Sequence, residues 1–157
     1  MDFKPHLVIE VGKKLITPDA RSMYNGMDIV KNYIQPLNLF EFGDYVYYEF
    51  IYKYEYPDIL IYSFIGSKQN NYQTLFNRSE GIINDLDGGP NILPRTIKDD
   101  NTILSMVDAL TLKNHVASEE FKNSTPKFPK KKKELEKLAA SLKETDNPVL
   151  VLVSLKE

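Results

Sequence analysis

The chain has 157 residues, of which 42% are hydrophobic and 27% charged, and these values are ordinary for a single globular domain. Its formal net charge of −2 creates no overall field that would attract nucleic acid or an anionic membrane, so neither is expected as a partner. The absence of cysteine excludes disulfides and thiolate chemistry but leaves the cellular compartment open.

The N-terminal part, residues 1–30, combines a short apolar segment with a polar, irregular one. It lacks the basic head and the long apolar run of a signal peptide, so we expect no export signal here. No segment approaches the roughly 18 apolar residues of a membrane helix, so we expect no direct membrane insertion. The sequence HLVIEVG (His6–Gly12) predicts an opening strand, and the polar stretch after it predicts a long connection or a weak helix.

Residues 31–80 are rich in tyrosine and phenylalanine, which fit the half-buried surface of a pleated sheet. Turn signals at Phe42–Asp44 and Tyr56–Asp58 separate three predicted strands, at about 33–41, 45–55 and 58–65. A fourth strand is predicted at 72–77, after the polar turn GSKQNN. Four short strands joined by tight turns predict an antiparallel meander of the size of one propeller blade.

The strand predicted at 45–55 has two alternating sides. The more apolar side, which we expect to face the core, begins with Val46, Tyr48 and Phe50. The opposite side begins with Tyr45, Tyr47 and Glu49. Exposed tyrosines bind sugar rings and peptides well, so Tyr45 and Tyr47 are candidate binding residues for a glycan or a peptide; the alternative is that they pack in a core.

The stretch NDLDGGPN contains the second candidate pair, Asp85 and Asp87. A helical calcium loop would need a third oxygen ligand where Gly89 stands, and it would need a closing glutamate that the loop lacks. Glycine and proline in this stretch favour a structural turn. Asp85 and Asp87 therefore remain candidate binding residues, and no metal or other cofactor is expected.

The C-terminal part, residues 81–157, predicts a second blade that contains a helix. Two short strands are expected around a turn at Asp99–Asn101, followed by a loosely helical segment. A helix is predicted at 129–144, with Pro129 in its first turn and an apolar face that contains Phe128, Leu135, Leu138 and Leu142. Pro148 blocks continuation, and PVLVLVSL predicts a last strand at 149–155 that is buried on both faces. The four lysines at 130–133 predict a solvated helix face more readily than a phosphate-binding patch.

Motifs for catalysis are scarce in this chain. Its two histidines, His6 and His115, stand in no recognisable catalytic pattern. The sequence contains no two-histidine zinc helix, no glycine-rich phosphate loop and no dinucleotide fingerprint. We therefore predict that the protein is not an enzyme.

Several motifs together resemble the C-terminal part of the six-bladed β-propeller lipoproteins of gut bacteria. In chain order, the matching segments are Asp85–Gly89, Pro94, Asp99–Asn101, Lys130–Leu142 and Asp146–Leu150. The chain departs from the family at Leu93, where an aromatic residue is usual. Whole members of the family are over twice as long and begin with a lipoprotein signal, which we do not expect in this sequence. The resemblance implies a mainly β protein of two to three blades, with a C-terminal helix and a final strand. It also implies envelope-associated parents and binding rather than turnover.

Two or three blades cannot close a propeller ring, so their terminal faces would be open. We expect these faces to be covered by self-association or by another propeller segment; alternatively, the C-terminal helix folds over one of them. The predicted function is a non-catalytic binding or assembly module of a cell-envelope type. The alternatives are a propeller-type hydrolase or lyase, and a truncated gene fragment without independent function.

Overall fold

The computed structural model describes residues 6–55, 57 and 59–155. The described helices are the 3₁₀ helix η1 (Gly12–Lys14) and the α-helices α1 (Pro18–Met23), α2 (Gly26–Asn32), α3 (Ala109–Ala117), α4 (Glu119–Asn123) and α5 (Pro129–Ser141). The strands are β1 (Gln35–Phe42), β2 (Tyr45–Ile51), β3 (Ile61–Ser67), β4 (Gln73–Asn77), β5 (Thr96–Asp99), β6 (Thr102–Val107) and β7 (Val149–Ser154).

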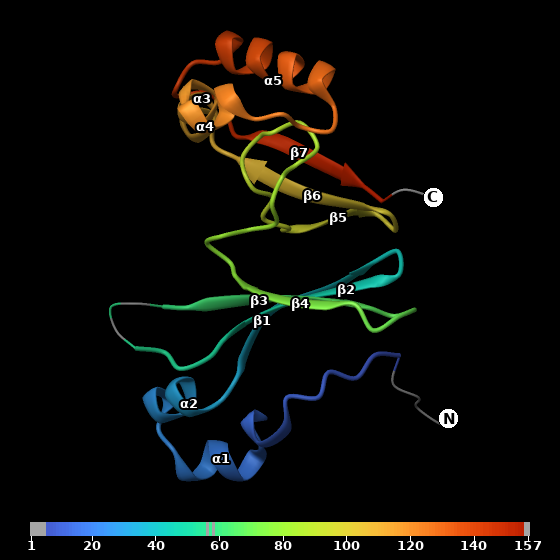
Figure 1. The fold of residues 1–157 in the computed structure, drawn as a ribbon. Coiled ribbons are helices and arrows are strands. Elements are labelled where there is room, and N and C mark those ends of the chain that lie inside the picture. Colours follow the sequence, from blue (N-terminus) through green and yellow to red (C-terminus); the bar gives the residue numbers. More distant parts are fainter. Residues whose placement is uncertain (1–5, 56, 58, 156–157) are drawn as a thin grey trace.

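The strands form two antiparallel sheets, as a mainly β fold requires. The first sheet has the order β1-β2-β3-β4, and the second sheet has the order β5-β6-β7. Figure 1 shows the two sheets one above the other, with α1 and α2 below the first sheet and α3–α5 above the second. The prediction of a mainly β chain with antiparallel sheets and a C-terminal helix is therefore confirmed.

The first sheet is the meander expected from the turn signals. Its four strands fall at the four predicted places, with ends that differ by a few residues. The predicted turn signal at Tyr56–Asp58 includes residues 56 and 58, which lie outside the described part. Gly43 makes the tight turn between β1 and β2 with a φ of +53°, a conformation that favours glycine. A Cβ atom at this position would also lie 2.5 Å from Leu155 Cδ1, so glycine here permits close contact with the C-terminal residues.

The second sheet combines a hairpin with a strand that is distant in the sequence. β5 and β6 enclose the predicted turn, in which Asp99 Oδ1 accepts a hydrogen bond of 3.1 Å from Asn101 N. β7 pairs with β6 in antiparallel register, with Ile103 opposite Val153 and Val107 opposite Val149. The predicted final strand is thus present, and the helices α3–α5 connect it to β6.

Helix α5 begins at Pro129 as predicted and ends at Ser141, three residues earlier than expected. The side chain of Lys113 stabilises its end, because Nζ donates hydrogen bonds to Leu142 O at 2.9 Å and to Ala139 O at 3.4 Å. The predicted apolar face is only partly used, since Leu135 and Leu142 pack inward while Phe128 and Leu138 are exposed.

The predicted opening strand at His6–Gly12 is not observed. Residues 6–11 belong to no strand, and Gly12 starts η1. A strand needs the edge of a sheet to pair with, and the segment instead lies over the first sheet. The polar stretch that follows forms two short helices, α1 and α2, whose N-termini are capped by Thr17 and Asn25.

Two clusters of buried side chains hold the layers together. The first lies between the sheets and contains Phe42, Tyr47, Ile65, Ile92 and Ile103. The second lies between the second sheet and the helices and contains Val107, Leu112 and Ala139. Because side chains alternate along a strand, Ile103 and Val107 point to the same face of β6. One face of the second sheet therefore packs on both the first sheet and the helices.

Candidate functional site

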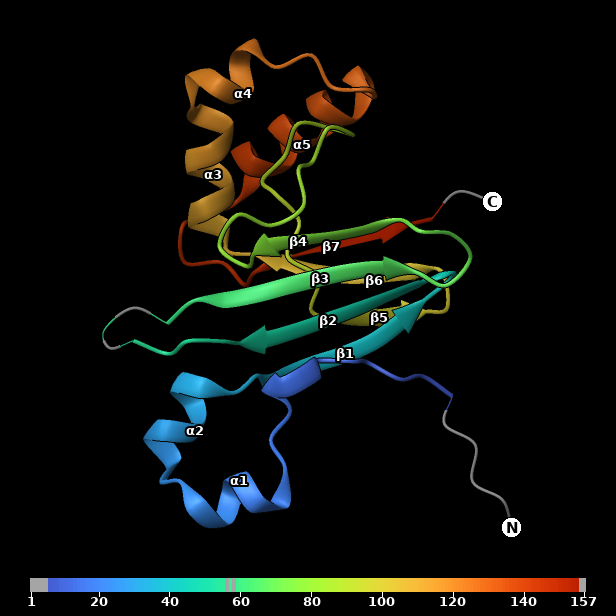
Figure 2. The same ribbon diagram turned by 60° about the horizontal axis from the view of Figure 1, so that its bottom comes forward.

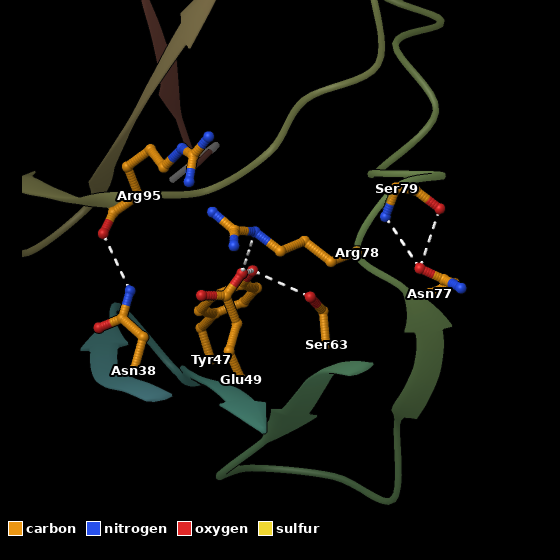
Figure 3. A network of polar contacts seen from close by, with 8 residues as sticks. All are labelled: Asn38, Tyr47, Glu49, Ser63, Asn77, Arg78, Ser79 and Arg95. Carbon is orange, nitrogen blue, oxygen red and sulfur yellow. Dashed lines mark hydrogen bonds and ion pairs between the residues drawn. The ribbon is translucent and has the colours of Figure 1, made fainter. Parts of the chain in front are cut away.

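Polar side chains form a buried network between the two sheets, and Figure 3 shows it at close range. Tyr47 and Glu49 lie on β2, Ser63 lies opposite Glu49 on β3, and Arg78 follows the end of β4. The Tyr47 hydroxyl donates a hydrogen bond of 2.6 Å to Glu49 Oε1 and lies 3.1 Å from Ser63 Oγ. Arg78 Nε lies 3.1 Å from the same Glu49 oxygen.

The network neutralises a carboxylate that the fold removes from water. Glu49 is only 4% exposed, and the guanidinium of Arg78 supplies the opposite charge. Burial raises the pKa of Tyr47 far above its ordinary value, and the hydrogen bond to Glu49 raises it further. The Tyr47 hydroxyl therefore stays protonated and donates its hydrogen bond to the Glu49 carboxylate.

Of the two interpretations of Tyr47, an exposed binding residue or a residue packed in a core, the structure agrees with core packing. Its side chain is fully buried, and its ring stacks on Phe40 with the ring centroids 4.8 Å apart. The opposite side of β2 is covered as well, because Val46 and Tyr48 are also buried. Alternation alone could not show this, because β2 is a central strand and both of its faces are covered.

Tyr45 is half-buried and lies near the turn that precedes β2. Its ring stacks on Phe42 with the ring centroids 5.6 Å apart, and it meets Tyr72 edge to face at 6.2 Å. These contacts place Tyr45 at the rim of the core between the sheets. Its role as a binding residue stays a prediction.

Asp85 and Asp87 lie in the loop between the first sheet and β5. Asp87 Oδ1 accepts hydrogen bonds from Asn84 Nδ2 at 2.8 Å and from Gly89 N at 2.9 Å, so this carboxylate holds the turn. Asp85 Oδ2 forms a surface ion pair of 2.7 Å with Lys127 Nζ. Nowhere in residues 6–55, 57 and 59–155 do three or more acidic, histidine or cysteine side chains gather as metal ligands would.

The same loop anchors the helices. His115 Nε2 lies 2.8 Å from Gly88 O, and the carbonyls of Asp85 and Leu86 accept hydrogen bonds from the backbone just before α5. Gly88 has a φ of +77°, which explains the need for glycine there. The aspartates thus belong to a loop beside α5, whereas the tyrosines belong to the core between the sheets, and the four candidate residues form no single site.

The side of the first sheet that faces away from the second sheet, which we call the outer face of the first sheet, carries an open groove of about 1000 Å³. Its floor includes Val46, Tyr48 and Phe64, and the segment Leu7–Val11 forms part of its wall. Leu75, which lies opposite Phe64 on β4, is 58% exposed on the same face. This apolar surface is therefore only partly covered.

The second sheet also has an apolar outer face, opposite to the face that packs on the first sheet. Met106 lies directly opposite Leu150, and Leu104 lies directly opposite Leu152. Leu150 is 59% exposed, and Met106 and Leu152 are exposed as well. The prediction that β7 is buried on both faces is wrong, because helix α5 packs only on the face that carries Val149 and Val151.

The lysine run at 130–133 is mostly solvated. Lys132 is the exception, since Nζ donates a hydrogen bond of 2.8 Å to Ser124 O and lies 4.7 Å from the ring centroid of Phe121. In the described part of the chain, no helix has the length and apolar character needed to cross a membrane. No protein-family model matches the sequence, and searches of curated proteins and of solved structures give no significant match.

Proposed function

We propose that the chain is a non-catalytic assembly module of the propeller type, in which the two sheets are successive blades. The four-stranded meander, the second antiparallel sheet stacked on it and the contact between β1 and β5 support this assignment. The motifs shared with the six-bladed propeller lipoproteins support it independently. In this arrangement the outer faces of both sheets are surfaces for further blades, supplied by a second copy or by another propeller segment.

The observation that carries the proposal is the apolar character of both outer faces. Leu39 and Leu75 are exposed on the first sheet, and Met106, Leu150 and Leu152 are exposed on the second. Covering the exposed half of one such side chain contributes about 1 kcal/mol, so several must be covered together to offset the entropy lost on association. A face-to-face contact between sheets covers several such side chains at once.

The contact between the two sheets within one chain supports an interface of this kind. Phe42, Tyr47 and Ile65 of the first sheet pack against Ile103 of the second sheet and against Ile92. Between two copies, the equivalent contact joins the outer face of the second sheet to the outer face of the first sheet in the next copy. Because the two surfaces differ, the association is head to tail, and it gives a ring if the rotation closes and a filament if it does not.

Light scattering coupled to size exclusion tests the proposal over a range of micromolar concentrations. Wild-type protein should elute as a species larger than the 18.1 kDa monomer. Leu150→Lys should shift it toward the monomer, because the contact would then bury an unpaired ammonium group. Leu110→Lys is the matched control, since Leu110 is also an exposed leucine but lies on helix α3.

A wild-type protein that stays at 18.1 kDa at every concentration would contradict the proposal. The same conclusion would follow if Leu150→Lys and Leu110→Lys associated as well as the wild type. Far-ultraviolet circular dichroism of both variants should match the wild type, which separates lost association from lost folding.

A further inference from the structure

The segment His6–Val11 has the side-chain pattern of a strand but no sheet. Leu7, Ile9 and Val11 are half-buried, whereas the residues that alternate with them are exposed, Val8 to 65%. The whole stretch from Leu7 to Val11 borders the groove. Among the described residues, the only backbone hydrogen bond of this segment joins Lys14 N to Val11 O at 3.2 Å. Its backbone groups are therefore available to the edge of a sheet.

The same sequence pattern occurs a second time in the chain and forms a strand there. Residues 5–9 read PHLVI, and residues 148–152 read PVLVL, so both have proline, any residue, leucine, valine and a further aliphatic residue. The second occurrence runs into β7, which pairs with β6 along its whole length. The difference between the two lies in the partner edge, because strand formation needs one.

The second sheet offers such an edge. It has three strands to the four of the first sheet, and β7 is its terminal strand. The sequence of β7, VLVLVS, carries neither a charge nor a proline that would block pairing with another strand. Its six residues equal the six of the segment His6–Val11 in length.

The segment cannot pair with β7 of its own chain while it stays in place. It lies on the outer face of the first sheet, where His6 Nε2 is 2.8 Å from Glu41 Oε1. Further along, Lys14 O accepts a hydrogen bond of 2.9 Å from Ile34 N. The second sheet packs on the opposite face of the first sheet, and Figure 2 shows the N-terminal segment and β7 separated by β1–β3.

A second copy solves this geometrical problem. In the proposed head-to-tail contact, the second sheet of one copy approaches the outer face of the first sheet in the next copy, where the segment lies. We infer that His6–Val11 adds to the free edge of β7 in a second copy of this chain and becomes the fourth strand of its second sheet. Strand addition of this kind derives affinity from main-chain hydrogen bonds. The inference rests on the proposed assembly function and names the segment that completes it.

Proline substitutions test the inference on the full chain. Successive N–H groups of a strand point to opposite edges, so either Val8→Pro or Ile9→Pro must remove a hydrogen bond to β7. At least one of the two variants should weaken association by about tenfold or more in sedimentation equilibrium. Val8→Thr and Ile9→Val are the controls, because they keep the N–H groups and the preference for strands. Both controls should associate as the wild type does.

Cross-linking gives a second readout that a general loss of stability would not produce. The chain has no cysteine of its own, so single cysteines can be introduced without background. Val8→Cys protein mixed with Leu152→Cys or Leu150→Cys protein should form a disulfide between different chains on mild oxidation, and the two partner positions cover two registers. Leu110→Cys should form none with Val8→Cys.

The outcomes separate the inference from the proposed function. If wild-type protein associates, both proline variants associate equally well and no disulfide forms, the segment does not pair with β7, while face-to-face assembly stands. If wild-type protein is monomeric at every concentration, both the proposed assembly and the strand addition are wrong. Loss of association with Leu150→Lys but with neither proline variant also overturns strand addition alone.

Discussion

The substitution Tyr47→Phe removes one oxygen atom from the centre of the polar network and leaves the aromatic packing in place. The hydroxyl donates a hydrogen bond of 2.6 Å to Glu49 Oε1 and lies within 3.1 Å of Ser63 Oγ. Phenylalanine keeps the stacked contact with Phe40, whose ring centroid is 4.8 Å away. The change in the free energy of unfolding should therefore report the network and not the core.

The expected loss follows from the partners that remain. A hydrogen bond to a charged group contributes about 1.5–3 kcal/mol, and Arg78 still neutralises Glu49 after the substitution. We therefore expect a loss of about 2 kcal/mol at pH 7. For a chain of this size, such a loss lowers the melting temperature by about 4–8 °C.

Urea and thermal unfolding at one fixed protein concentration measure this loss. The control is Tyr48→Phe, since Tyr48 is buried on the other side of the same strand and its hydroxyl has no hydrogen-bond partner among the described residues. Tyr48→Phe should change the free energy of unfolding by less than about 0.5 kcal/mol. Equal stability of the two variants would show that the network does not stabilise the fold.

Three further predictions concern the same framework. Burial raises the pKa of Tyr47, so above pH about 10 the tyrosine of the unfolded chain releases its proton before that of the folded chain does. The free energy of unfolding should therefore fall by up to about 1.4 kcal/mol per pH unit. Urea unfolding at alkaline pH should show a smaller fall in Tyr47→Phe than in the wild type. Gly43→Ala should cost about 2 kcal/mol or more in chemical unfolding, because alanine disfavours a φ of +53° and its Cβ would meet Leu155. An unchanged urea midpoint would contradict that reasoning. Asp87→Ala should cost about 1–2 kcal/mol through its two lost hydrogen bonds, whereas Asp85→Ala should cost less than about 1 kcal/mol, since it removes only a surface ion pair; the reverse order would contradict the assigned roles.

The exposed apolar side chains on the outer faces of the two sheets link the fold to the proposed assembly. An exposed apolar patch on a folded protein commonly marks an interaction surface. Here the patches lie on the two opposite ends of a stack of sheets, on Leu75 of the first and Leu150 of the second. In the proposed assembly, each added copy would cover one such face and present another, so the association would propagate until it closes or is capped by a different segment.

Local signals in the sequence predicted most of the elements. The turns around Gly43 and at Asp99–Asn101 separated the strands of both sheets, and Pro129 marked the start of helix α5. These features act over a few residues, because glycine, proline and short polar side chains restrict the backbone where they stand. The order of strands within the first sheet also followed, since consecutive strands with short turns pair with each other.

Tertiary structure alone decided which of these elements had partners and which faces were covered. Tyr47 alternates with Tyr48 in a strand whose two sides are both aromatic, so only the stacking of the second sheet revealed that Tyr47 is buried and that Glu49 needs Arg78. The segment His6–Val11 has the sequence of a strand, yet it is none in the single chain, while a similar sequence forms β7. The physical reason is the same in both cases, because pairing and burial depend on residues that are distant in the sequence, whereas turns and helix ends depend on their neighbours.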